Sequence, residues 1–168
     1  MDNLLYIIVV YPILFILPAY AANGAPVILG GGTPIDLNRK FNKKPIFGKH
    51  KTIKGLISGI ASGILMGFIE STAPGFGFML YIGIAQALGT HFGDLLGSFI
   101  KRQQGSKEGH KAELLDQYLF LIFAFIFSIP FGNAPVIYGV IFIFLFTWLM
   151  HRLTNKIAYK LRLKDVPW

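Results

Sequence analysis

The chain has 168 residues, of which 54% are hydrophobic and only 14% are charged, and its formal net charge is +8. About a quarter of the residues of an ordinary soluble domain are charged, so this composition excludes a water-soluble globule and predicts one membrane-embedded domain over residues 1–168. Cysteine is absent, which excludes disulfides and thiolate chemistry.

The first apolar segment, Leu4–Ala22, follows the acidic residue Asp2. A secretory signal peptide begins with basic residues, so we expect this segment to be a retained membrane helix. Pro12 and Pro18 predict a kink in it, because membrane helices tolerate proline where neighbours satisfy the freed carbonyls. The segment Asn23–Thr52 then repeats glycine and proline, which predicts a long ordered loop whose backbone can approach a ligand closely.

Four more apolar segments follow, and a membrane helix needs about 20 such residues. They are Ile53–Ile69, Gly77–Ile100, Leu114–Ile129 and Ala134–Met150. The predicted fold is therefore an all-α integral membrane protein with five transmembrane helices. The basic tail Thr154–Trp168 predicts an interfacial helix or a frayed end.

The charge distribution predicts the orientation of these helices. All 16 Lys and Arg residues fall in Arg39–Lys54, Lys101–Lys111 and Arg152–Lys164, and none lies in the short loops Ser71–Phe76 and Pro130–Asn133. With five spans the three basic stretches share one face, which the positive-inside rule makes cytoplasmic. The N-terminus is then outside and the C-terminus inside. We expect lipid head groups and phosphates as partners of these basic residues, and no nucleic acid.

The third apolar segment carries a polar face near its basic end. His91, Asp94, Ser98, Lys101 and Arg102 occupy positions that fall on one side of a helix. An ionisable residue within a membrane segment is a functional candidate by default, which singles out Asp94. The alternative is an acid near the helix end that is paired with Lys101 or Arg102.

Asp116 begins the fourth segment, where it suits either a helix N-terminus or a metal ion. Asp94 and Asp116 flank one cytoplasmic hairpin, so their carboxylates can converge. Two such carboxylates suit Mg²⁺, which keeps waters and takes phosphate oxygens as its other ligands. The spacing of the histidines does not indicate zinc.

A second basic cluster, Lys49-His50-Lys51-Thr52, directly precedes the second helix. Free amides, a hydroxyl group and two lysines at a helix N-terminus predict a phosphate site; the alternative is that these lysines only orient the protein. The chain has no nucleophile elbow and no Walker phosphate loop. These patterns together predict a metal–phosphate site at the inner membrane surface.

The order Gly93-Asp94-x-x-x-Ser98-x-x-Lys101-Arg102, followed by Lys107 and Asp116, resembles the signature of the membrane cytidylyltransferases that make CDP-diacylglycerol. Asn23-Gly-Ala-Pro26, Gly-Gly-Thr33-Pro-Ile-Asp36 and Gly48-x-x-Lys51-Thr52 are similar to the archaeal branch of that family, the CDP-archaeol synthases. The resemblance covers nearly the whole chain. The chain departs from the pattern at Leu119, where relatives commonly have a second acid.

The resemblance implies transfer of CMP from CTP to an isoprenoid ether-lipid phosphate in the cell membrane, with Mg²⁺ as cofactor and pyrophosphate as the second product. It implies Mg²⁺ ligation by Asp94 and Asp116, and catalysis by these two residues with Lys101. The implied nucleotide- and phosphate-binding residues are Asn23, Gly24, Pro26, Lys49, Lys51, Thr52, Ser98, Arg102 and Lys107. Two alternatives remain open: a small membrane transporter with Asp94 as coupling residue, and a phosphotransferase that consumes a CDP-activated lipid.

Overall fold

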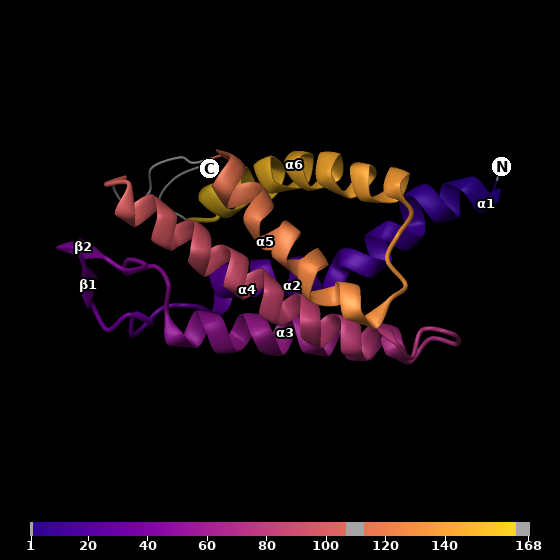
Figure 1. The fold of residues 1–168 in the computed structure, drawn as a ribbon, viewed down its shortest axis with the longest axis horizontal. Coiled ribbons are helices and arrows are strands. Elements are labelled where there is room, and N and C mark those ends of the chain that lie inside the picture. Colours follow the sequence, from indigo (N-terminus) through magenta and orange to yellow (C-terminus); the bar gives the residue numbers. More distant parts are fainter. Residues whose placement is uncertain (1, 107–112, 164–168) are drawn as a thin grey trace.

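The structure is a computed structural model that describes residues 2–106 and 113–163. These residues form five long helical segments that pack as a bundle (Figure 1). The first consists of α1 (Asp2–Leu5), the π-helical turn η1 (Tyr6–Val10) and α2 (Tyr11–Leu29). The others are α3 (Ile53–Ser71), α4 (Met79–Gln103), α5 (Glu113–Ser128), which ends in the 3₁₀ turn η2 (Ile129–Phe131), and α6 (Ile137–Lys160).

Three of the five segments are long and apolar enough to cross a membrane within the described residues: Asn3–Leu29, Ile53–Ser71 and Ile137–Lys160. The apolar part of the fourth, Tyr118–Phe131, is shorter. The helix α4 is long but more polar, because Gln86, Thr90 and His91 lie on its inner face, where they are buried. Those side chains face other helices, so they lower the mean hydropathy of α4 without placing polar groups on its outer surface.

Two predicted boundaries are wrong. The first helix does not end at Ala22 but continues to Leu29, so the predicted loop starts seven residues later. Pro26 is accommodated inside this helix because Val27, Ile28 and Leu29 extend its apolar surface, and the proline removes only one backbone donor. The last helix passes Met150 and ends at Lys160, so much of the predicted basic tail continues α6.

The helix α3 packs through a row of glycines. Its buried residues are Gly55, Gly59, Gly63 and Gly67, which are spaced by four and therefore share one face. A Cβ atom on Gly67 would lie 2.7 Å from the Cα atom of Gly83 in α4. Backbone-to-backbone packing of this kind is typical of membrane helices, where small residues allow close approach. The glycine face thus brings α3 against both α2 and α4.

Glycines also allow close backbone packing between α4 and α5. A Cβ atom on Gly89 would lie 2.3 Å from the carbonyl oxygen of Phe123, and one on Gly93 would lie 2.3 Å from that of Leu119. The helices therefore run antiparallel in a register that sets Gly93 opposite Leu119. This register bears on the site, because Asp94 follows Gly93 and Asp116 precedes Leu119 by three residues.

A buried side-chain amide connects α4 to α2 next to Pro18. The Nε2 group of Gln86 donates to the carbonyl oxygen of Phe15 at 2.8 Å, and its Oε1 accepts from the backbone N–H of Ala19 at 3.3 Å. These backbone groups flank Pro18, which has no N–H to donate. Backbone groups on both sides of Pro18 are thus bonded by a polar side chain of a neighbouring helix, while the kink itself stays a prediction.

Candidate functional site

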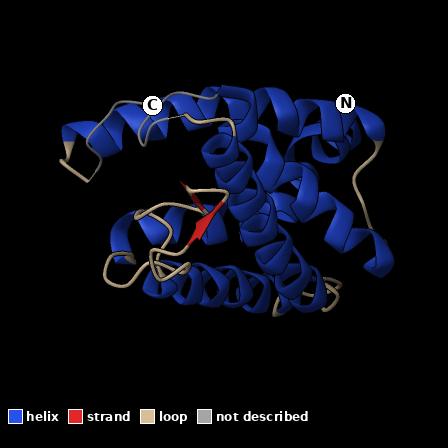
Figure 2. Cartoon of the chain, turned by 60° about the vertical axis from the view of Figure 1, so that its left-hand side comes forward, coloured by secondary structure: helices blue, strands red, loops and turns tan. Residues whose placement is uncertain are grey.

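The long loop between α2 and α3 is ordered and lies at the same end of the bundle as the last turn of α4 (Figure 1). It contains a hairpin of two short strands, β1 (Lys40–Phe41) and β2 (Lys44–Pro45), visible among the loops in Figure 2. Asn42 and Lys43 form its turn with φ angles of 49° and 63°, as a two-residue type I′ turn requires. The prediction of an ordered, tightly turning loop is confirmed, although the all-α prediction did not include the hairpin.

The hairpin contacts the end of α4. The ring of Phe41 packs against that of Phe99 with centroids 5.9 Å apart. The side chain of Gln103 donates to the carbonyl oxygen of Pro45 at 3.2 Å, and the ammonium of Lys44 donates to the carbonyl oxygen of Gln103. These contacts hold the loop over the basic end of α4.

Asp36 organises the loop from within. Its Oδ2 accepts from the backbone N–H groups of Phe47 and Gly48 at 2.9 and 3.2 Å, and its Oδ1 accepts from that of Asn38 at 3.0 Å. Burial raises the pKa of this carboxyl group, but the backbone donors together outweigh burial, so its pKa lies below the usual value. Asp36 is therefore a charged structural centre of the loop.

The loop then runs alongside the entry to α3. The N–H of Ile35 donates to the carbonyl oxygen of Lys51 at 2.8 Å, and that of Ile53 donates to the carbonyl oxygen of Thr33 at 3.0 Å. Thr52 lies between these bonds as the N-cap of α3, and its hydroxyl oxygen accepts from the N–H groups of Gly55 and Gly31 at 3.1 and 3.2 Å. Thr52 is buried and fixes the backbone, while Lys51 projects from it.

Lys51 and Asp94 form an ion pair between this loop and α4. The Lys51 ammonium lies 2.6 Å from both carboxylate oxygens of Asp94, so the contact is bidentate. The two side chains are only 28% and 33% exposed, which strengthens their attraction relative to a surface pair. The sequence singled out both residues but did not predict that they pair; its alternative partners for Asp94 were Lys101 and Arg102.

The other predicted site residues of α4 differ in how far their side chains are buried. Ser98 and Arg102 are buried and Lys101 is half-buried. His91 is also buried, one turn before Asp94, against the backbone of α3 at Gly59. The predicted polar face of α4 is thus confirmed as an inward-facing surface.

Asn23, Gly24 and Pro26 lie in the last turns of α2, where the sequence predicted loop. Helix packing nevertheless places them near the ion pair. Gly59 faces both Ala22 and His91, and Gly55 contacts Pro26, so the end of α2 and Asp94 lie at the same level along α3. Lys49 is exposed in the turn that precedes α3, two residues before Lys51.

Asp116 belongs to α5, and its side chain lies outside the described residues, as does all of Lys107. The backbone register still places Asp116. Because Leu119 lies opposite Gly93 and Phe123 lies opposite Gly89, the Asp116 backbone is about two residues, or about 3 Å along the helix axis, beyond the level of Asp94. The predicted convergence of the two acids therefore remains a prediction that the register favours.

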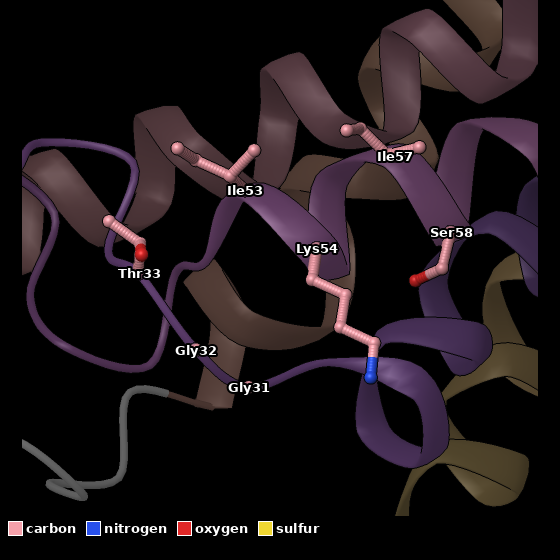
Figure 3. A pocket seen from close by; sticks show the side chains of 7 residues that line it. All are labelled: Gly31, Gly32, Thr33, Ile53, Lys54, Ile57 and Ser58. Carbon is pink, nitrogen blue, oxygen red and sulfur yellow. The ribbon is translucent and has the colours of Figure 1, made fainter.

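One feature near the ion pair was not predicted. A groove of about 460 Å³ runs along the first two turns of α3 and is lined by Gly31, Gly32, Thr33, Ile53, Lys54, Ile57 and Ser58 (Figure 3). The sequence pattern that could have indicated this groove is a glycine-rich loop followed by a lysine and a serine, four residues apart, at the start of a helix. The lysine was interpreted only as part of a positively charged loop.

Comparisons with known proteins agree with this arrangement. The family model described as CarS-like, CDP-archaeol synthase, matches residues 4–168. The CDP-archaeol synthase of Pyrococcus abyssi is 43% identical over 160 residues, which cover 92% of this chain and 95% of that protein. The CDP-archaeol synthase of Sulfolobus acidocaldarius is 38% identical over 157 residues, which cover 93% of this chain and 96% of that protein.

A solved structure supports the fold as well. It is described as an intramembrane enzyme for archaeal membrane lipid biosynthesis, and it superposes with a TM-score of 0.79. Its sequence is 35% identical, and the match covers 85% of this chain and 91% of that one.

Proposed function

The chain belongs to the CDP-archaeol synthase family and is a CTP-dependent cytidylyltransferase of membrane lipid biosynthesis, and we propose that its acceptor is an isoprenoid glycerol-ether phosphate. The observation that carries the site assignment is the bidentate Lys51–Asp94 pair at the basic end of the bundle. It places an acid and a cation at the start of α3, the helix whose first two turns line a groove with lysine and isoleucine side chains.

The proposed reaction joins the two phosphates directly. An oxygen of the lipid phosphate attacks the α-phosphorus of CTP, a new P–O bond forms there, and the bond to the β-phosphate oxygen breaks to release pyrophosphate. The protein needs to align the reactants and neutralise their charge. We assign these tasks to Lys51, which pairs with Asp94, and to Lys101 and Arg102, which lie in the last turn of α4. Lys49 and Lys107 would serve as further cations.

The residues present fit Mg²⁺. This ion typically uses one or two carboxylates and completes its shell with waters and substrate phosphates. Asp94 offers a carboxylate whose side chain is 33% exposed, and among the described side chains no group of three acids, histidines or cysteines lies together as a metal cage. Asp94 and Asp116 would hold the ion. When bound, it would withdraw electron density from phosphate oxygens and offset their negative charge.

Lys51 would have a role both before and after a phosphate binds at this site. In the structure its ammonium neutralises Asp94. A phosphate that arrives beside the carboxylate competes for the same ammonium, and Lys51 can turn toward it without losing an anionic partner. Ser98, Asn23, Gly24 and Pro26 remain our candidates for nucleotide contacts, whereas the hydroxyl oxygen of Thr52 already caps α3.

We further propose that all five helical segments cross the membrane, with the N-terminus outside. The loop that follows α2, the end of α4 and the end of α6 then lie on the cytoplasmic side, where the basic residues are concentrated. CTP would enter from the cytoplasm and the lipid laterally from the bilayer.

The test is transfer of label from α-³²P-CTP into lipid by the purified protein with Mg²⁺ and the ether-lipid phosphate. We expect labelled CDP-lipid and equimolar pyrophosphate. Asp94→Asn should lower kcat more than about 100-fold, since even residues that only orient metal ligands contribute 10–100-fold. Glu70→Gln, at the opposite end of α3, is the matched acid control and should retain wild-type turnover.

Folded protein that labels no lipid phosphate would refute the proposal. Consumption of CDP-lipid in the presence of an alcohol would instead support a phosphotransferase. Asp94-dependent ion flux in liposomes without nucleotide turnover would support a transporter.

A further inference from the structure

The groove along α3 has walls of two chemical kinds. Ile53 and Ile57 are 42% and 63% exposed, on the side of α3 that points away from the buried glycine face. Lys54 extends its ammonium toward Gly31, and the Ser58 hydroxyl points to the same side (Figure 3). The groove therefore presents one cation beside an apolar strip that faces the surroundings of the bundle.

Lys54 differs from Lys51 in its partners. Within residues 2–106 and 113–163, no carboxylate pairs with Lys54, which is exposed, whereas Lys51 is paired with Asp94. A single lysine beside isoleucines complements a phosphate attached to hydrocarbon chains. A nucleoside triphosphate, with about four negative charges, would require more cations than this groove offers.

The groove is directly joined to the ion pair by the backbone. Thr33, in its wall, accepts the hydrogen bond from Ile53, and the next bond joins Ile35 to Lys51. Only two residues of extended chain, at most about 7 Å, separate Ile53 from Lys51. Lys54 and Lys51 thus flank the start of the same helix, so a phosphate held by Lys54 and a nucleotide held at Lys51 and Asp94 would both bind at this end of α3.

Two glycines line the loop side of the groove and leave it unobstructed. Gly31 and Gly32 have φ angles of 99° and 81°, a conformation that favours glycine, and no atom lies within 4 Å of a Cβ placed on either. The N–H of Gly31 donates to the Thr52 hydroxyl oxygen, which ties the wall to the start of α3. The loop therefore passes the groove without filling it with side chains.

We propose that this groove binds the lipid acceptor, with Lys54 holding its phosphate and with Ile53 and Ile57 contacting the first segments of its isoprenoid chains. The inference rests on the proposed function and adds the entry route: the lipid reaches the site along the outer face of α3. Lys54 is then a substrate-binding residue of the acceptor, distinct from the nucleotide residues around Asp94.

The test measures KM separately for CTP and for the ether-lipid phosphate in mixed micelles. Lys54→Ala should raise KM for the lipid about tenfold or more, the usual effect of one lost charge-assisted contact, and change KM for CTP less than about twofold. Lys54→Arg should restore most of the lipid affinity. Lys156→Ala, an exposed lysine of α6, is the matched charge control and should leave both constants unchanged.

A steric pair tests the apolar wall independently. Ile57→Trp should fill the groove and raise KM for the lipid, whereas Leu65→Trp, on the same helix and similarly exposed at 58%, should not. The inference is overturned if Lys54→Ala raises KM for CTP instead, or if the two tryptophan variants behave alike. If the wild-type protein transfers CMP to no lipid phosphate, the proposed function itself fails. That outcome differs from a failure of the groove assignment, in which the wild-type protein is active but the variants do not behave as stated.

Discussion

Substitution of Gly59 by alanine tests the close packing that brings α2, α3 and α4 together. The new Cβ atom would lie 2.2 Å from Nε2 of His91 and 2.7 Å from the carbonyl oxygen of Ala22, where an ordinary contact is 3.4–4 Å. His91 is only 6% exposed, and the carbonyl belongs to the backbone of α2. The Ala22 carbonyl cannot move unless the interface between α2 and α3 opens, whereas the buried His91 ring would have to turn within its packed surroundings.

The expected magnitude follows from two opposing terms. Overpacking a well-filled interior typically costs about 1–3 kcal/mol, and the two simultaneous overlaps place Gly59→Ala at about 3 kcal/mol. Alanine is a better helix former than glycine by about 1 kcal/mol. The net loss is about 2 kcal/mol, which lowers the unfolding temperature of a chain of this size by about 4–8 °C.

The assay is thermal unfolding of the purified protein in one detergent, followed by intrinsic tryptophan fluorescence at a single scan rate, since irreversible unfolding depends on that rate. Gly24→Ala is the matched control, because Gly24 is also helical but has no atom within 4 Å of its added Cβ. We expect the control to unfold at the wild-type temperature or up to about 4 °C above it. If Gly59→Ala is as stable as Gly24→Ala, the close packing of the three helices is wrong.

Three further changes probe the loop, its junction with α3 and the proline-containing part of α2. The lowered pKa of Asp36 means that its stabilisation is complete above its unfolded pKa of about 4 and is lost as pH falls through the lower folded value. Limited proteolysis should leave the wild-type loop intact at pH 7 and cut it faster as the pH falls below about 4, whereas the loop of Asp36→Asn should be cut at pH 7 as well. Thr52→Ala removes the N-cap of α3 and should cost about 1 kcal/mol, seen as a lower unfolding temperature than that of Thr52→Ser. Gln86→Leu leaves the Phe15 carbonyl and the Ala19 N–H without their side-chain partner and should cost about 1–3 kcal/mol. An unchanged unfolding temperature would show that α2 does not need these two bonds near Pro18.

Much of the fold was predictable from the sequence because membrane helices require long apolar runs. All five helical segments occur where the apolar runs predicted them, and the second begins at the predicted residue, Ile53. The error at Asn23–Leu29 arose because Gly24 and Pro26 are typical of turns in water. Inside a bundle, neighbouring helices can donate to the backbone carbonyl that proline leaves without a partner, so the same residues continue a helix.

The ion pair was predictable as two residues of interest but not as a contact between them. Lys51 and Asp94 each stood out, one before a helix and one inside another. Their pairing depends on how α3 packs against α4, and chain position alone does not determine that. The signal that carried this information was the four-residue spacing of Gly55, Gly59, Gly63 and Gly67, which indicates a close helix contact.

That glycine row also determines how accurately the ion pair is placed. A shift of α4 by one residue against α3 would move Asp94 by 1.5 Å along the axis and rotate it by about 100°, enough to break a bidentate contact made at 2.6 Å. Backbone contacts such as that of Gly67 with Gly83 resist such shifts because no side chain can change rotamer to absorb them. The register that stabilises the bundle is therefore the same register that holds the Lys51–Asp94 pair together. If this pair belongs to the active site as proposed, a substitution far from it, such as Gly67→Ala, should lower kcat as well as stability. Retention of wild-type kcat in a clearly destabilised Gly67→Ala protein would show that the site is held by its loop alone.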